Sequence, residues 1–237
     1  MRILHTSDWH LGQNFYGKSR EKEHQKFIDW LLAQVKLHKV ECVIVAGDVF
    51  DTGAPPSYAR ALYNHFIVEI SKQQCRLVVV AGNHDSVSVL NESKQILNEL
   101  GTTVVASASD EYDNQIVRLE VNSQLKGFVC SVPYIRPRDL VLSDSGESAR
   151  EKQNKLQVAI ANHYKALKQE VDELNDANLP VIATGHLTAL GVKTSSSERD
   201  IYIGTLEAFP SSEFPEFDYI ALGHIHRPQR VGNTEHI

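Results

Sequence analysis

The chain has 237 residues, of which 42% are hydrophobic and 23% charged, the balance of an ordinary soluble globular protein. No stretch approaches the roughly 20 apolar residues that a membrane-spanning helix needs, and residues 1–10 are too polar for a signal peptide. The net charge of −6 argues against a simple electrostatic clamp on nucleic acid. Two bound divalent cations would add four positive charges and weaken that objection.

The three cysteines, Cys42, Cys75 and Cys130, lie in or beside apolar runs that are far apart in the sequence. Because their number is odd, we expect buried thiols rather than disulfides or metal ligands. Free thiols are typical of a reducing compartment, so the sequence predicts a cytoplasmic protein.

Five short apolar runs, rich in Val and Ile, predict buried β-strands. Most of them end in a glycine followed by a polar residue. Their residue ranges are 2–8, 40–48, 76–85, 179–186 and 217–224.

Three segments between or after the first strands carry apolar residues at helical spacing, and Ser19 is expected to cap the first of them. This alternation of strand and helix predicts a mostly parallel sheet with crossover helices. The predicted helices are 19–38, 57–71 and about 91–100.

The middle of the chain has a different pattern. Residues 115–121 and 125–135 predict two strands that pair as a hairpin, and residues 149–177 predict one long charged helix. Two sheets accommodate these extra strands better than one. We therefore predict an α/β fold in one domain, and the last residues, 227–237, look like a strand begun and not paired.

The polar residues that follow the five strands are the main candidates for a functional site, because ligands of open α/β sheets bind at the carboxyl ends of the strands. Each short motif alone is also typical of a turn or a helix cap. Together they offer oxygen and imidazole donors without thiolates, which suit Mn²⁺, Fe²⁺ or Zn²⁺, and enough of them for two ions. The candidates are Asp8, His10, Asp48, Asp51, Asn83, His84, Asp85, His186, His224 and His226.

The order of these motifs, "DWH", "GDVFD", "GNHD", "GHL" and "GHIH", resembles that of the calcineurin-like metallophosphoesterases. Within that family, "LHTSDWHLGQ", "SERDIYIGT" and "FDYIALGHIHRPQ" resemble the nucleases of double-strand-break repair. The resemblance covers nearly the whole chain. It implies a four-layer sandwich, in which two facing β-sheets are flanked by helices, and a site for two metal ions.

The resemblance also implies roles for individual residues. His84 matches the catalytic histidine of the family, and Asp85 supports it, either by orienting its ring or by capping the next helix. At Asp51 archaeal and eukaryotic relatives have a histidine implicated in exonuclease action, and whether Asp51 replaces it or lies behind the ligands is open. The implied metal ligands are Asp8, His10, Asp48 and His226 for one ion, and the bridging Asp48 with Asn83, His186 and His224 for the other.

The implied function is Mn²⁺-dependent hydrolysis of DNA, by exonuclease action on double-strand ends and endonuclease action on hairpins, in DNA repair, recombination and replication. The implied partners are an SMC-like ATPase subunit and a second copy of the chain. The dimer would use the helices near 57–70 and 90–100, whose apolar faces are equally suited to the core. In this interpretation residues 1–237 are the nuclease core, and a capping domain and ATPase-binding region are absent from the chain.

Basic residues near the strand ends are candidates for DNA contacts, although each is also typical of a solvated loop. The loop 188–205 beside His186 either covers the substrate or borders the site. The candidate contacts are Lys18, Arg20, Arg136, Arg138, Lys193, Arg199 and Arg227.

Two other functions are compatible with the sequence. One is a small-molecule or cyclic-nucleotide phosphodiesterase of the same superfamily, because the same centre can hydrolyse such esters. The other is a DNA-binding module with a vestigial metal site. Every proposed ligand position holds a competent donor, which disfavours this second alternative.

Overall fold

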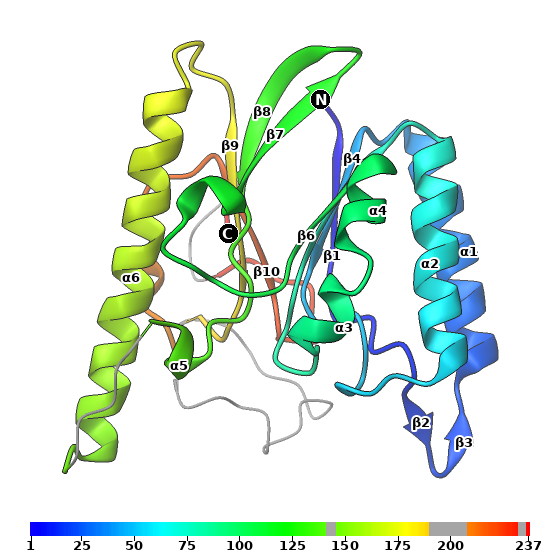
Figure 1. Ribbon diagram of the computed structural model, residues 1–237, viewed down its shortest axis with the longest axis horizontal. Helices are drawn as coiled ribbons and strands as arrows, with labels where there is room; N and C mark the ends of the chain where they lie inside the picture. Colours follow the sequence, from blue (N-terminus) through cyan, green and yellow to red (C-terminus); the bar gives the residue numbers. More distant parts are fainter. Residues whose placement is uncertain (141–145, 190–207, 232–235) are drawn as a thin grey trace.

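A computed structural model describes residues 1–140, 146–189, 208–231 and 236–237, and its strands form two four-stranded sheets and one short two-stranded sheet (Figure 1). The first sheet consists of β1 (Ile3–Thr6), β4 (Cys42–Ala46), β5 (Arg76–Val80) and β6 (Thr102–Val105). Its strand order is β1-β4-β5-β6, and all neighbouring strands run parallel. The predicted parallel sheet is therefore confirmed.

The second sheet holds the strands of the middle and end of the chain in the order β10-β9-β8-β7. The hairpin of β7 and β8 is antiparallel, whereas β8, β9 and β10 run parallel. The hairpin predicted from residues 115–135 is thus present. The four strands are β7 (Ile116–Val121), β8 (Gln124–Cys130), β9 (Val181–His186) and β10 (Tyr219–Gly223).

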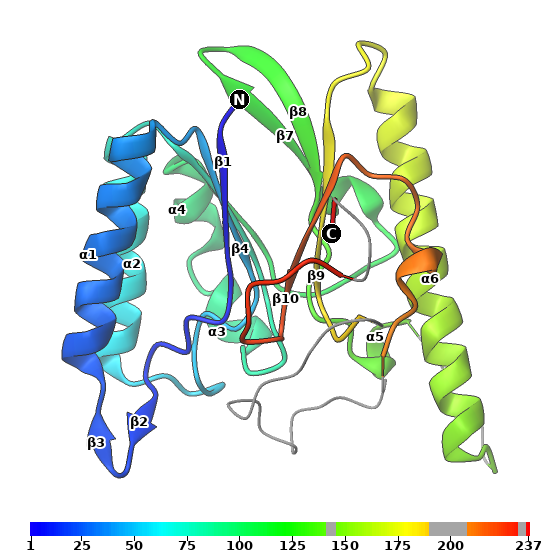
Figure 2. The same ribbon diagram turned by 180° about the vertical axis from the view of Figure 1, so that it is seen from behind.

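Helices cover the outer faces of both sheets, as Figures 1 and 2 show. The pair α1 and α2 packs on the first sheet, and the long α6 packs on the second, so the four-layer sandwich is confirmed. The helices are α1 (Glu21–His38), α2 (Ser57–Lys72), α3 (Val87–Asn91), α4 (Lys94–Glu99), α5 (Pro137–Leu140) and α6 (Ala149–Leu174), with 3₁₀ turns at Tyr112–Gln115 and Ser211–Glu213.

Alternate residues of the strands fill different apolar layers, because successive side chains of a strand point to opposite faces. In β4, Val43 and Val45 pack under the outer helices, whereas Cys42 and Ile44 face the second sheet. The layer between the sheets is apolar on both sides. Burial on both faces of the strands explains why the sequence shows continuous apolar runs there.

Several boundaries differ from the sequence prediction. The helix predicted near 91–100 is divided into α3 and α4, and β6 was not predicted. The short hairpin of β2 (Asn14–Phe15) and β3 (Lys18–Ser19) was also missed, and its turn has Tyr16 at φ 47° and Gly17 at φ 75°. The N-cap of α1 is Arg20 rather than the predicted Ser19, but Ser19 Oγ accepts a hydrogen bond from Glu21 N, at the start of the helix, at 3.2 Å.

The strand predicted for 125–135 ends early, at Cys130. The residues beyond it bond to other parts of the chain: Val132 N donates to Thr184 Oγ1 at 2.7 Å, and Tyr134 N donates to Ala81 O at 2.7 Å. This segment therefore runs across the end of the first sheet. Among the described residues after β10, none forms the strand that was predicted near 227–237.

Cys42, Cys75 and Cys130 are buried and free, which confirms the prediction for the thiols. In the part of the chain that the structure describes, no helix has the length and apolar character to cross a membrane.

The buried His163 of α6 gives a prediction for the stability of the fold. Its side chain is 2% exposed, with Nε2 3.0 Å from Gln115 Oε1, and burial lowers the pKa of His163 to about 4. The ordinary pKa of histidine is 6.5. Between pH 6.5 and pH 4, His163 therefore binds a proton in the unfolded chain but not in the folded chain. The free energy of unfolding should therefore fall by roughly 3 kcal/mol between pH 6.5 and pH 4 through this group.

Urea unfolding of the wild type and of His163→Gln from pH 7 to pH 4 measures this effect. The variant should lose less stability over that range, because it has no imidazole to protonate in the unfolded state. Parallel profiles for the two proteins would contradict the prediction.

Candidate metal centre

The polar residues that follow the strands meet at one end of the sandwich, because the carboxyl ends of both sheets lie there (lower end in Figure 1). Asp8 follows β1, and His224 follows β10 on the other sheet. The backbone N–H of His224 donates to both carboxylate oxygens of Asp8, at 3.1 and 3.2 Å. Positions 216 residues apart are thereby held together.

Two glycines make this close approach possible. A Cβ on Gly223 would lie 1.9 Å from Ala46 O of the first sheet, and a Cβ on Gly82 would lie 2.0 Å from Asp48 Oδ1. Both distances are far below van der Waals contact. The glycines at the ends of the apolar strands are therefore required by the contact between strand ends.

Four of the predicted ligands have left-handed backbone conformations. The φ angles are 55° for Asp8, 46° for His10, 51° for Asp48 and 89° for His224. Such a conformation costs roughly 1–3 kcal/mol for a residue with a side chain, and it persists where the surrounding structure enforces it. The backbone here turns sharply enough to aim these side chains at one point.

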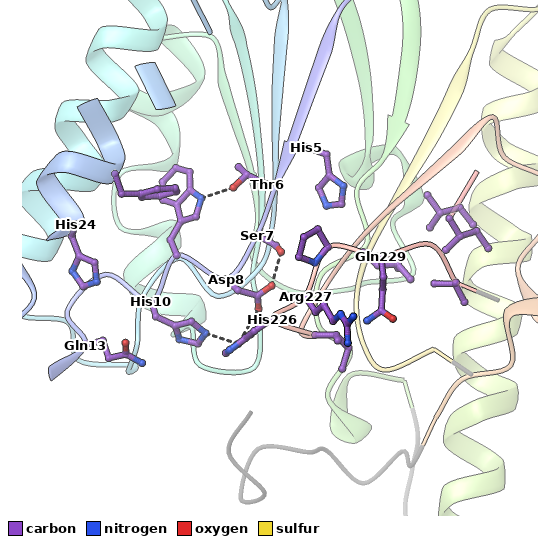
Figure 3. Close-up of a pocket in the computed structure, with 18 of the residues that line it drawn as sticks. His5, Thr6, Ser7, Asp8, His10, Gln13, His24, His226, Arg227 and Gln229 are labelled. Carbon is purple, nitrogen blue, oxygen red and sulfur yellow. Dashed lines mark hydrogen bonds and ion pairs between the residues drawn. The ribbon is translucent and has the colours of Figure 1, made fainter. Parts of the chain in front are cut away.

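Asp8, His10 and His226 form the first set of donors, at the edge of a cavity (Figure 3). His10 Nε2 and His226 Nε2 lie 3.0 Å apart, and His226 Nε2 is 3.6 Å from Asp8 Oδ1. Two ring nitrogens that face each other so closely need a shared proton or a cation. This set therefore fits a metal ion.

Asn83, His186 and His224 form the second set. Asn83 Oδ1 lies 3.1 Å from His186 Nε2 and 3.0 Å from His224 Nδ1. His186 Nδ1 faces the carbonyl oxygen of Ala46 at 2.9 Å, and because a carbonyl only accepts, Nδ1 carries the proton. In a neutral ring this leaves Nε2 available as a ligand, the arrangement common for metal-binding histidines.

The carboxylate of Asp48 lies between the two sets and is 1% exposed. Its Oδ2 is 3.3 Å from His186 Nε2, 3.7 Å from His10 Nε2 and 3.9 Å from His84 Nε2. The carboxylate of Asp48 therefore contacts imidazoles of both sets. An ion bound by either set of donors would lie close to the carboxylate of Asp48.

The charges of the centre are strongly coupled. Burial raises the pKa of Asp48, but His186, His10 and His84 outweigh it and hold the pKa well below its ordinary value. Burial lowers the pKa of His186, but Asp48 outweighs it and raises the pKa to about 9. Burial and the neighbouring His186 lower the pKa of His224 to about 4. A metal ion would therefore compete with the proton of His186.

The donors of the centre fit divalent cations. Among the residues that the structure describes, three groups have their ligand atoms within 4.8 Å of one another, and Asp48 belongs to two of them. Carboxylate, imidazole and amide donors without sulfur suit borderline and hard cations. The groups are Asp8-His10-His226, His10-Asp48-His84 and Asp8-Asp48-His186.

His84 is oriented by Asp51. The Nδ1–H of His84 donates to the backbone carbonyl of Asp51 at 2.7 Å, which leaves Nε2 toward Asp48. The carboxylate of Asp51 faces His10 instead, with Oδ1 3.4 Å from His10 Nδ1. Asp51 therefore lies behind the two rings.

Asp85 does not have either of its predicted roles. Its carboxylate accepts hydrogen bonds from the backbone N–H groups of Val49, Phe50 and Gly82, at 3.2, 2.9 and 2.8 Å. The cap of α3 is Ser86, so Asp85 neither orients His84 through its side chain nor caps that helix. Burial, followed by the charge of Asp48, raises the pKa of Asp85 to about 6. This residue clamps the turns after β4 and β5.

The predicted DNA contacts lie in different environments. Arg20 and Arg227 line the cavity of about 690 Å³ that also holds Asp8, His10 and His226. Lys18 and Arg138 are exposed, whereas Arg136 Nη2 donates to the carbonyl of Asp85 at 2.9 Å. Lys193, Arg199 and most of the loop 188–205 lie outside the described residues.

Sequence reasoning missed Gln13 and Ser7. Arg20 Nη1 donates to Gln13 Oε1 at 2.6 Å, and Gln13 Nε2 lies 3.5 Å from Asp51 Oδ1. The hydroxyl of Ser7 donates to Asp8 Oδ2 at 2.5 Å. The position of Ser7 next to Asp8 in the sequence indicates a contact between them. Gln13 and Asp51 are 38 positions apart, and no local pattern of residues predicts their contact.

Residues 1–228 match the calcineurin-like phosphoesterase family. The chain is 56% identical over 238 residues to SbcD, a subunit of the nuclease SbcCD, of Escherichia coli (strain K12), covering 100% of this chain and 59% of that protein. The SbcD proteins of Rhodobacter capsulatus and Bacillus subtilis are 35% and 30% identical, over 98% of this chain and 59% and 58% of theirs. The chain spans about three fifths of the length of these relatives, and the predicted resemblance is confirmed.

The contact of Gly82 with Asp48 can be tested by Gly82→Ala. We expect this variant to lose about 3 kcal/mol of unfolding free energy, because the added methyl overlaps Asp48. Gly53→Ala is the matched control, since its Cβ would lie 3.6 Å from the nearest atom, and it should change stability by less than about 0.5 kcal/mol. Equal losses in urea unfolding of both variants would refute the proposed close approach.

Proposed function

The chain belongs to the calcineurin-like phosphoesterase family, and on this premise we propose that residues 1–237 form the catalytic core of a two-metal nuclease. The reaction is hydrolysis of phosphodiester bonds in DNA, by exonuclease action on double-strand ends and endonuclease action on hairpins. The proposed role is in DNA repair, recombination and replication. Similarity to proteins that are named as part of the nuclease SbcCD supports DNA as the substrate.

The observation that carries this proposal is the position of Asp48 between two sets of donors. We assign Asp8, His10 and His226 with Asp48 to one ion, and Asn83, His186 and His224 with Asp48 to the other. The contacts of Asp48 Oδ2 with His186 and His10 support a shared carboxylate. Among divalent cations Mn²⁺ is our choice, since it accepts both carboxylate and imidazole ligands.

Two divalent ions, when bound, supply Lewis-acid activation of water and of the phosphoryl oxygens. The side chains of the site supply the charge balance and the proton transfer. Asn83 offers a neutral oxygen, which limits the negative charge that a phosphate must approach. His84, held at Nδ1 by the carbonyl of Asp51, presents Nε2 to the centre and donates a proton to the leaving oxygen when its ring is protonated.

The cavity beside the first donor set supports a path for DNA. Arg20 and Arg227 line it together with Asp8 and His10, so positive charge lies next to the proposed ions. With a net charge of −6, the chain needs local cations and bound metal to attract a polyanion. Lys18 and Arg138, which are exposed, extend this proposal to the rim.

The proposed partners are the SMC-like ATPase SbcC and a second copy of the chain. The names of the relatives, which describe one component of a complex, support the first. A dimer through α2 and α4 would use their exposed side chains, such as Val68 at 40% and Ile96 at 66%. The apolar face of α2 belongs to the core of this chain, with Leu62 and Phe66 buried in it.

We propose a cytoplasmic location for the protein. The three buried free thiols support a reducing compartment.

Cutting of linear duplex and hairpin DNA in the presence of Mn²⁺ tests the proposed function. We expect the wild type to cut both, and Asp48→Ala to be at least about 10²-fold slower, because the shared ligand is gone. Asp29→Ala, a change on the exposed face of α1, is the control and should retain full activity.

The other outcomes separate the alternatives. Hydrolysis of bis(p-nitrophenyl) phosphate without cutting of DNA would indicate a small-molecule phosphodiesterase. Binding of fewer than two ions, without hydrolysis of either substrate, would indicate a vestigial site.

The role of His84 is tested by His84→Gln. Metal affinity should stay within about threefold of the wild type, while turnover falls by about 10²–10⁴-fold, because only proton transfer is lost. His65→Gln on the exposed side of α2 is the control. If calorimetry shows a comparable loss of Mn²⁺ binding in His84→Gln, His84 is a ligand.

A further inference from the structure

Asp51 contacts two imidazoles of the centre through different chemical groups. Its backbone carbonyl accepts the Nδ1–H of His84 at 2.7 Å, and its carboxylate oxygen Oδ1 faces His10 Nδ1 at 3.4 Å. The residue is 7% exposed, and its charge therefore faces the protein interior. Asp51 belongs to neither of the proposed ligand sets.

The contact with His10 is electrostatic. His10 Nδ1 is buried and, in the described part of the chain, forms no hydrogen bond; Asp51 Oδ1 is the charged group that it faces. The Nδ1 edge of the His10 ring therefore faces the carboxylate of Asp51, and its Nε2 edge faces His226.

The carboxylate is itself supported from the rim of the cavity. Gln13 Nε2 lies 3.5 Å from Asp51 Oδ1, and Gln13 Oε1 accepts from Arg20 Nη1 at 2.6 Å. The backbone holds the same segments together, since Asp51 N donates to Leu11 O at 3.1 Å. A row of polar contacts therefore runs from Arg20 through Gln13 and Asp51 to His10.

We propose that Asp51 is a positioning residue whose carboxylate orients His10 toward the first ion, while its backbone carbonyl separately orients His84. This inference rests on the proposed two-metal function. A carboxylate behind a metal-binding histidine fixes its tautomer and ring orientation, and its loss typically costs 10–100-fold in metal affinity.

The two contacts can be separated by mutation. Asp51→Asn removes the charge that faces His10, but the backbone carbonyl that holds His84 remains. The variant should therefore lose metal affinity and keep the machinery of proton transfer. Gln13→Ala leaves Asp51 in place and removes only its support, so a smaller effect is expected.

The experiment is a calorimetric titration of Mn²⁺ into the whole 237-residue chain. In Asp51→Asn one of the two binding events should weaken 10–100-fold and the other by less than about twofold. Gln13→Ala should weaken the same event by less. Asp29→Asn removes an exposed carboxylate from α1, and both of its affinities should equal those of the wild type.

Turnover against Mn²⁺ concentration gives a second measurement. Asp51→Asn should approach the wild-type rate at saturating Mn²⁺, because His84 is intact, whereas His84→Gln should stay slow at every concentration. Wild-type affinity for both ions in Asp51→Asn and Gln13→Ala would overturn the inference. A slow rate of Asp51→Asn at saturating Mn²⁺ would also overturn it.

Failure of the proposed function gives a different result. In that case the wild type itself would bind fewer than two ions or fail to cut DNA. If Asp51→Asn does not fold, as judged by urea unfolding, Gln13→Ala decides the inference, and it is refuted when both ions bind as in the wild type.

Discussion

The buried charge of Asp48 is the constraint on which the centre depends. A carboxylate that is 1% exposed has lost almost all its hydration, and proteins retain such a charge only where opposite charge or hydrogen bonds replace the water. His186 and His10 lie within 3.7 Å of it and come from different sheets. The groups that compensate the anion therefore come from both sheets, with His186 contributed by the second.

Holding this arrangement costs stability at the site. Four candidate ligands have left-handed backbones, and two glycines leave no room for a single methyl. The surrounding structure offsets this cost with three apolar layers and with the clamp of Asp85 on the turns after β4 and β5. Donors fixed in this way need little rearrangement to accept ions. The rigidity of the fold thereby serves the chemistry.

Three aspartates, Asp48, Asp51 and Asp85, lie within 38 positions of the chain. Their side chains are chemically identical, but different burial and different contacts give them different roles. Asp48 faces imidazole nitrogens and is placed to bind ions, whereas Asp85 faces backbone N–H groups and fixes turns. Asp51 lies behind His10 and joins it to the cavity rim through Gln13.

The sequence by itself determined the strands with long apolar runs, the long helix and the set of polar residues at the strand ends, because apolar runs and their glycine-polar endings are local signals, whereas β2, β3 and β6 were missed. It also predicted the meeting of Asp8, Asn83 and His224, since parallel strands end at one edge. Only the tertiary structure decided the partners: Asp85 with three N–H groups, Asp51 with two imidazoles, and Arg136 with a carbonyl. These contacts join segments that are distant in the chain, so their geometry depends on how the two sheets pack, and no local pattern of residues encodes that.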